Sequence, residues 1–400
     1  MKITQNINSS FPIWIIIFLL IIIPINLSFK DLTSIDLDAY PRLLYATSGY
    51  LFTLPISFFF VIPFIFLGIL NFNRDIDIFV FIIICSISLI SAIFNDSFSH
   101  ILLVAKIIIP IILLFGFEIF FKKKFLFNKD KNMFLIIKNS NRKIAQMFMV
   151  VFFISMISPL YLENPYNWLT NDIVIYDYLQ YFPMIFILLL GILASNKQRY
   201  IILLVYLLSF NFFYWGDNFT IFFLLILFGI YYFLSILAGR NKLVSLSKTF
   251  NFIILFCLIF YQLSVIFYLE FLSNDFQFDL GQLNSRIFFI SQFNYNVNII
   301  EFFTPIRFTS EIVSKYYHNE LTVIISAIGI LGATMFYFIL LKRIWYISQF
   351  YPEISVAISL VCALSGVVVT FNLHPYSFIL STFLISYYYV LSKIQSQKSL

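Results

Sequence analysis

The residues of this sequence that could do chemistry gather in one polar stretch, residues 272–320. Its notable side chains are three cations and a polar trio at its end: Arg286, Arg307, Lys315, His318, Asn319 and Glu320. Arginine presents a planar, permanently charged fork that suits phosphate oxygens. The imidazole of a histidine can take up a proton near neutral pH. The combination favours phosphate binding beside a general base, whereas a cap without chemistry is the alternative for the stretch as a whole.

The same stretch carries an apolar pattern at helical spacing. Aromatic and aliphatic residues recur between Ile287 and Phe303, which predicts an amphipathic helix on the membrane surface. Pro305 interrupts it, and a second short helix is expected over residues 308–317. The cations and the histidine are therefore expected in a partly helical loop rather than in a flexible linker.

Four other features are weaker candidates. Lys106 lies near the end of an apolar run, where it either reaches the interface or serves as a buried cation for a phosphate group. Asp36-Leu37-Asp38 resembles an acidic metal or base motif, but a second such match, Asp75-Ile76-Asp77, indicates chance. Aromatic and acidic residues in 162–178 suit sugar binding or a membrane belt. His374, in a tight turn, is expected to be a turn residue.

Composition indicates the elements that position these residues. The chain of 400 residues is 61% hydrophobic and 11% charged, whereas a soluble domain carries roughly 25% charged residues. This excludes a soluble, disordered, fibrous or nucleic-acid-binding protein. It leaves an all-α polytopic membrane protein, because helices satisfy their own backbone groups in lipid. We expect a single integral membrane domain over residues 1–400, with three scattered cysteines that predict neither a disulfide framework nor a metal site.

A membrane-spanning helix needs about 20 apolar residues, and twelve such runs occur in the sequence. They cover residues 12–28, 46–71, 78–94, 101–121, 145–161, 179–195, 200–215, 219–238, 251–271, 321–341, 350–371 and 375–392. The first is expected to be an uncleaved signal-anchor. The spans are almost uncharged, with Lys106 as the main exception.

The loops between these runs predict an orientation. With the N-terminus inside, nineteen of the 25 Lys and Arg residues fall inside, five fall outside, and Lys106 lies within the fourth run. This distribution follows the positive-inside rule and places both termini in the cytoplasm. Residues 272–320 then form the largest outside loop, between the ninth and tenth spans. His100, His318 and His374 all fall on the outside as well.

One stretch of about 50 residues, 286–335, carries a family resemblance. An outside arginine is followed by a polar loop, then His318-Asn319, then a span containing Ile-Gly-Ile-Leu-Gly from Ile328 to Gly332. This arrangement, with a largest outside loop late in a twelve-span chain, resembles the O-antigen polymerase and O-antigen ligase family. These are bacterial inner-membrane glycosyltransferases that use saccharides linked to undecaprenyl pyrophosphate.

The resemblance implies roles for individual residues. Arg286 would contact the pyrophosphate, His318 would act as a base or position the acceptor, and Asn319 would orient it. Arg307 is assigned to substrate binding by its chemistry, with Lys315, Glu320 and Lys106 as further binding candidates. Family members often carry a Ser-Arg pair upstream, and the corresponding place here, Trp215 to Thr220, has no cation. The phosphate site would then be rebuilt from Arg286, Arg307 and Lys106.

The resulting hypothesis is a metal-independent, inverting polymerase of lipid-linked oligosaccharide repeat units, with no cofactor and an active site facing the periplasm. Expected partners are the undecaprenyl-pyrophosphate-linked oligosaccharide, the lipid bilayer and, in the pathway, a flippase and a chain-length regulator, but no nucleic acid. An O-antigen ligase acting on a lipid A-core acceptor and a lipid-linked saccharide flippase or transporter remain the alternatives.

Overall fold

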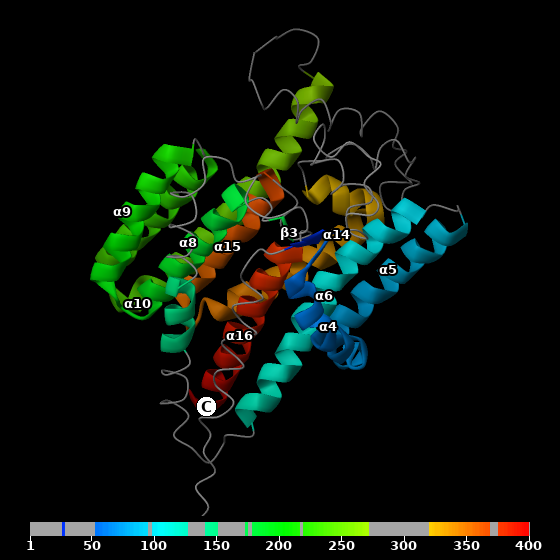
Figure 1. Cartoon of the computed structure of the whole chain (residues 1–400), viewed down its shortest axis with the longest axis horizontal. Coiled ribbons are helices and arrows are strands. Elements are labelled where there is room, and N and C mark those ends of the chain that lie inside the picture. Colours follow the sequence, from blue (N-terminus) through cyan, green and yellow to red (C-terminus); the bar gives the residue numbers. More distant parts are fainter. Residues whose placement is uncertain are drawn as a thin grey trace, which may run out of the picture.

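The computed structural model describes most of the predicted helices and leaves other parts of the chain undescribed. The described residues are 26–28, 53–94, 98–126, 141–150, 173–174, 178–216, 219–271, 320–368 and 375–399. Within them the chain is helical apart from one small sheet and short connections, which confirms the predicted helical class (Figure 1). The loop 272–319 lies outside the described residues, so its predicted helices and cations do as well.

Three consecutive helices follow the second to fourth predicted spans. They are α4 (Ile56–Ile69), α5 (Ile76–Phe94) and α6 (Phe98–Leu126), with a 3-10 turn, η3 (Phe72–Arg74), between the first two. Asp75 caps α5, because its Oδ1 accepts hydrogen bonds from the backbone N–H groups of Asp77 at 3.1 Å and Ile78 at 3.4 Å. Further along, residues 141–150 are helical and overlap the fifth predicted span.

The middle of the chain forms α8 (Tyr178–Ser195), α9 (Arg199–Gly216) and α10 (Phe219–Phe271). The first two match predicted spans closely. The third covers two predicted spans, 219–238 and 251–271, and contains a break at Gly239 with φ 67° and ψ 172°. This backbone region is essentially confined to glycine. The two predicted spans are therefore separate helices that meet at the Gly239 break, and residues 240–250 between them are helical.

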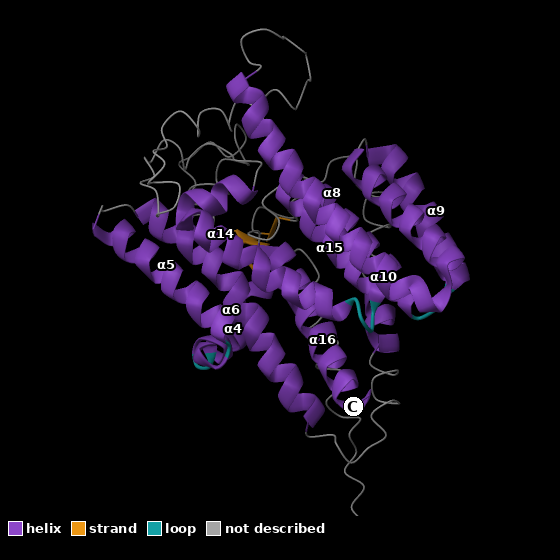
Figure 2. Ribbon diagram, turned by 180° about the vertical axis from the view of Figure 1, so that it is seen from behind, coloured by secondary structure: helices purple, strands orange, loops and turns teal. Residues whose placement is uncertain are grey.

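The last three helices are α14 (Glu320–Ile347), α15 (Pro352–Val368) and α16 (Pro375–Ser399). They match the tenth to twelfth predicted spans, but α14 continues past residue 341, where its span was expected to end. A second glycine break, with φ 71° and ψ 174°, occurs in α14 at Gly329. Figure 2 shows the helices as a bundle seen from behind, with α14 beside α5 and α6.

A small antiparallel sheet departs from the all-helical prediction. Its strands are β1 (Asn26–Ser28), β2 (Thr53–Pro55) and β3 (Ile173–Val174), in the order β2-β1-β3. The expected spans 12–28 and 46–71 are thus wrong at these ends, since 26–28 and 53–55 are strands. Proline disfavours helix at the residue before it and is tolerated on an edge strand, which explains why helix begins only after Pro55. β3 falls in the predicted outside loop 162–178, and β1 and β2 fall in the outer parts of their predicted spans.

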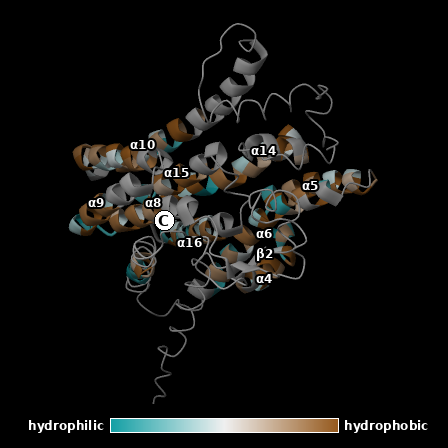
Figure 3. Cartoon of the chain, turned by 45° about the horizontal axis from the view of Figure 1, so that its top comes forward, coloured by the Kyte–Doolittle hydropathy of each residue, from teal (hydrophilic) through white to brown (hydrophobic). Residues whose placement is uncertain are grey.

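Apolar side chains on the outer surface of the bundle identify it as a membrane protein. Among the described residues, three helical segments are long and apolar enough to cross a membrane: Ile76–Phe94, Leu103–Lys123 and Ala327–Ile347. On α5, Ile83, Ile87, Ile90 and Ile93 are exposed at spacings of three and four residues, so they form one continuous apolar face. Figure 3 shows how hydrophobic residues dominate this helix. Water would not tolerate such a face, whereas lipid does.

Close approach of backbones holds α4 against α6. A Cβ atom added at Gly116 would collide with the carbonyl oxygen of Phe64, and one added at Gly68 would collide with the carbonyl oxygen of Ile112. Small residues at such crossings let membrane helices pack backbone to backbone. Pairs of residues predicted on one side of the membrane also meet across the bundle, as Asn251 does with Ser355 at 3.1 Å and Tyr346 with Ser396 at 2.7 Å.

Candidate functional site

Most of the predicted site residues lie outside the described part of the chain. Arg286, Arg307, Lys315, His318 and Asn319 belong to this group. Two others are placed: Glu320 is the first residue of α14, and Lys106 is a half-buried residue of α6. The described residues therefore define the helices that flank the predicted site, rather than the site itself.

At the predicted outer end of the bundle, three helices meet through a buried histidine. The Nε2 atom of His100, in the first turn of α6, lies 3.0 Å from the carbonyl oxygen of Ala327 in α14. It also lies 3.2 Å from the hydroxyl of Ser88 in α5, and that hydroxyl donates to the same carbonyl. His100 is 2% exposed. Its predicted place in an outside loop is corrected, since it lies inside a helix and in the core.

The break at Gly329 explains why the Ala327 carbonyl needs these partners. In a continuous helix this oxygen would accept a hydrogen bond from the backbone N–H of residue 331. The extended ψ of 174° at Gly329 interrupts that pattern. A buried carbonyl without a partner is costly, and in lipid there is no water to replace it. His100 and Ser88 satisfy the carbonyl and so make the break in α14 tolerable.

The Ser88 and His100 pair is built to hold the helix and not to generate a nucleophile. The Ser88 proton is directed at the Ala327 carbonyl, and the Nε2 atom of His100 contacts that same oxygen. An imidazole that donates through this nitrogen has no lone pair there to accept the serine proton. Burial lowers the pKa of His100, against an opposing effect of the Ala327 carbonyl. The ring is therefore neutral at neutral pH.

Lys106 does not share this cluster. It follows His100 by six residues in the same helix, which at 3.6 residues per turn is a rotation of about 240°. Lys106 therefore points from a different face of α6. Its predicted role in binding a phosphate group stays a prediction.

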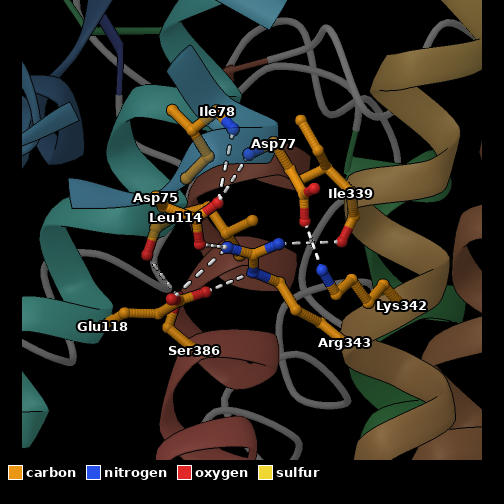
Figure 4. A network of polar contacts seen from close by, with 9 residues as sticks. All are labelled: Asp75, Asp77, Ile78, Leu114, Glu118, Ile339, Lys342, Arg343 and Ser386. Carbon is orange, nitrogen blue, oxygen red and sulfur yellow. Dashed lines mark hydrogen bonds and ion pairs between the residues drawn. The ribbon is translucent and has the colours of Figure 1, made fainter. Parts of the chain in front are cut away.

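The opposite end of the same helices holds a buried ionic cluster (Figure 4). Arg343 of α14 is 1% exposed, and its Nε donates to Oε1 of Glu118 in α6. Its terminal nitrogens also reach Oε2 of Glu118 at 3.4 Å, Oδ2 of Asp75 at 3.3 Å and the carbonyl of Ile339 at 3.1 Å. Lys342 pairs with Asp77 beside it. The guanidinium is thus surrounded by acceptors from three segments.

This cluster corrects two parts of the sequence analysis. Arg343, predicted in an inside loop, is buried in a helix that extends beyond the expected end of its span. Glu118 is a buried charge within the fourth predicted span, in addition to Lys106, the main charge predicted there. The sequence does indicate such a pair, because a carboxylate inside an apolar run needs a cationic partner. The Asp75-Ile76-Asp77 pattern is a helix cap and two ion pairs, in line with its interpretation as a chance match.

A hydrogen bond from α16 completes the inner cluster. The Ser386 hydroxyl donates to the carbonyl of Leu114 in α6 at 2.7 Å, and both residues are buried. The rings of Phe117 and Phe383 meet edge to face at 5.4 Å between centroids on the same interface. Because every charge of the cluster is already paired, its geometry is that of a clamp between helices.

Comparisons of the chain with protein-family models, with curated proteins and with solved structures find no match. The resemblance of residues 286–335 therefore rests on the residues themselves.

Proposed function

We propose that this protein is a membrane glycosyltransferase that polymerises lipid-linked oligosaccharide repeat units at the outer face of the bacterial inner membrane. The donor is a saccharide on undecaprenyl pyrophosphate, and the acceptor is a hydroxyl of another lipid-linked saccharide. The proposal is carried by the arrangement in residues 286–335, where an arginine, a polar loop and His318-Asn319 precede a span with Ile-Gly-Ile-Leu-Gly.

The proposed topology has twelve spans with both termini in the cytoplasm. Two features of the described bundle support it. The Ser88, His100 and Ala327 contacts join residues at predicted outer helix ends, and the Arg343 cluster joins residues at predicted inner ends. Since contacts pair outer ends with outer ends and inner ends with inner ends, the alternation of α5, α6 and α14 agrees with the loop charges.

The proposed reaction is a single inverting displacement. The acceptor oxygen attacks the anomeric carbon of the donor, the bond from that carbon to the pyrophosphate oxygen breaks, and undecaprenyl pyrophosphate leaves. His318 takes the acceptor proton or positions the acceptor, and Asn319 orients the imidazole. Arg286 and Arg307 stabilise the charge that develops on the pyrophosphate, with Lys315, Lys106 and Glu320 as further binding residues.

The helix α14 begins directly after the proposed catalytic pair in the sequence and is anchored in the bundle. His318 and Asn319 directly precede Glu320, the first residue of α14. Ile324, Ile325 and Ile328 of the same helix are buried, and Ala327 is bonded to α6. His318 is therefore joined through Asn319 to the first residue of a helix that is anchored in the bundle. This supports a role in chemistry, because catalytic groups require rigid support.

The decisive assay detects the leaving group, so it requires no knowledge of the sugar. Lipid-linked saccharides are extracted from a strain that lacks the gene and are supplied to the purified protein in proteoliposomes. A polymerase releases undecaprenyl pyrophosphate and lengthens the remaining lipid-linked saccharides. A ligase releases it only when a lipid A-core acceptor is added. A flippase releases none, and that result would reject a transferase.

Three variants test the residue assignment in this assay. His318→Ala and Arg286→Ala are expected to lower the release rate at least about a hundredfold, the scale of losing a general base or a preorganised charge. Arg142→Ala is the matched control, because this arginine is exposed and lies on the predicted inner side. Full activity in both test variants, with normal membrane insertion, would reject the assignment while leaving the reaction class open.

A further inference from the structure

The first part of α14 is a short helix that is bonded to α5 and α6 at Ala327. Residues 320–328 precede the break at Gly329, and a helix of this length is not stable by itself in isolation. Its path differs from that of the longer part of α14 that follows (Figure 1). Something outside the segment must therefore fix its orientation.

That attachment lies at Ala327. The carbonyl of this residue accepts from His100 at 3.0 Å and from Ser88, so both of its acceptor positions are used by side chains from two other helices. All three residues are buried. Ala327 follows Glu320 by seven residues, or about two helical turns and roughly 10 Å along the axis. The attachment thus lies about two turns from Glu320, the residue that directly follows the His318-Asn319 pair in the sequence.

The Ala327 carbonyl requires a hydrogen-bond donor on a side chain that is long enough to reach it. Gly329 adopts φ 71° and ψ 174°, a conformation that costs other residues about 1–3 kcal/mol. Glycine therefore permits the break, but it does not select the direction that the preceding segment takes. The direction is set by the two hydrogen bonds to Ala327 and by the burial of Ile324 and Ile328.

We propose that His100 is a positioning residue for the glycosyl transfer, with Ser88 as its partner. By holding the Ala327 carbonyl, the two side chains fix the segment 320–328, which His318 and Asn319 directly precede in the sequence. This inference rests on the proposed function. His100 acts through α14 and does not touch the substrate.

Kinetics separate positioning from simple stabilisation. His100→Ala removes the donor, whereas His100→Gln keeps a side-chain N–H that can reach the same carbonyl. Ser386→Ala is the matched control, because it deletes a buried hydrogen bond from a side chain to a carbonyl of α6, far from the first part of α14. All variants are assayed in proteoliposomes for release of undecaprenyl pyrophosphate, with kcat and KM determined for the lipid-linked donor.

The expected result is a loss in kcat of about tenfold or more for His100→Ala with KM changed less than about twofold, because a displaced catalytic group slows the chemical step. His100→Gln is expected to recover most of the rate, and Ser386→Ala to stay within about twofold of wild type. Wild-type kcat in His100→Ala, or an equal loss in Ser386→Ala, overturns the inference alone. Absence of release by the wild-type protein overturns the proposed function and this inference together.

Discussion

Replacing Arg343 by methionine removes the cation at the centre of the inner cluster and is expected to destabilise the protein strongly. The side chain of Arg343 is 1% exposed and that of Glu118 is 9% exposed, so the remaining carboxylate would be buried without its partner. Breaking a buried ion pair from one side costs about 3–5 kcal/mol in free energy of unfolding. Glu118→Gln should cost less, about 1–3 kcal/mol, because Arg343 keeps Asp75 at 3.3 Å and the Ile339 carbonyl at 3.1 Å.

The double replacement, Arg343→Met with Glu118→Leu, distinguishes pairing from simple packing. It removes both charges at once, and apolar side chains of similar volume often restore most of the stability of a buried pair. Asp75 remains, but its side chain is 26% exposed and its Oδ1 still caps α5. The double variant is therefore expected to be more stable than Arg343→Met alone.

The measurement is the midpoint of SDS-induced unfolding in mixed micelles, followed by circular dichroism. Lys342→Met is the control, because Lys342 is 51% exposed and its pair with Asp77 is near the surface. Such a pair contributes less than about 1 kcal/mol. If Arg343→Met unfolded at the wild-type midpoint, or if the double variant lost the sum of both single losses, the clamp interpretation would be refuted.

Three further outcomes follow from the described contacts. Gly116→Val is expected to lower the free energy of unfolding by at least about 1–3 kcal/mol, since its Cβ meets the Phe64 carbonyl, as measured by the same SDS titration. Asp75→Asn should keep the cap of α5 and should therefore lower the free energy of unfolding by about 1 kcal/mol less than Asp75→Ala does. Burial lowers the pKa of His100 below its ordinary value of 6.5, so the unfolded chain binds the proton more readily. Stability is then present above pH 6.5 and lost as the pH falls below it, and His100→Gln should remove this dependence between pH 7.5 and 5.5.

Hydropathy predicted most described helices well because lipid imposes a simple length requirement. The expected runs 78–94, 179–195 and 200–215 differ by at most two residues per end from α5, α8 and α9. The same reasoning could not find β1 or β2, since a strand of three residues next to an apolar run has no periodicity of its own. The pairing partners of these strands lie far away in sequence.

The sequence indicates that buried charges need partners, but it does not indicate which residues pair. Counting Lys and Arg residues indicates on which side of the membrane a loop lies. It cannot show that the side chain of Arg343 is buried in the bundle, because this depends on its ion pair with Glu118, more than 200 residues earlier. The break in α14 at Gly329 could not be predicted from the sequence for a related reason. Glycine in an apolar run is compatible with a continuous membrane helix, and only the side chains that meet Ala327 make the interruption stable.

The two ends of α14 bear on the choice between an enzyme and a transporter. A transporter that opened its inner face between α14 and the pair α5 and α6 would have to separate Arg343 from Glu118 and Asp75 in each cycle. Arg343 and Glu118 are buried, and Arg343 is paired with both carboxylates. Each opening would therefore leave a buried charge without its partner, which is unfavourable. A transferase that works only at the outer face needs no such movement. It gains from the clamp, because a helix fixed at its inner end and attached at Ala327 offers steady support to the residues that precede it. The inner cluster therefore fits a protein that keeps α5, α6 and α14 together at their inner ends, as the proposed transferase would.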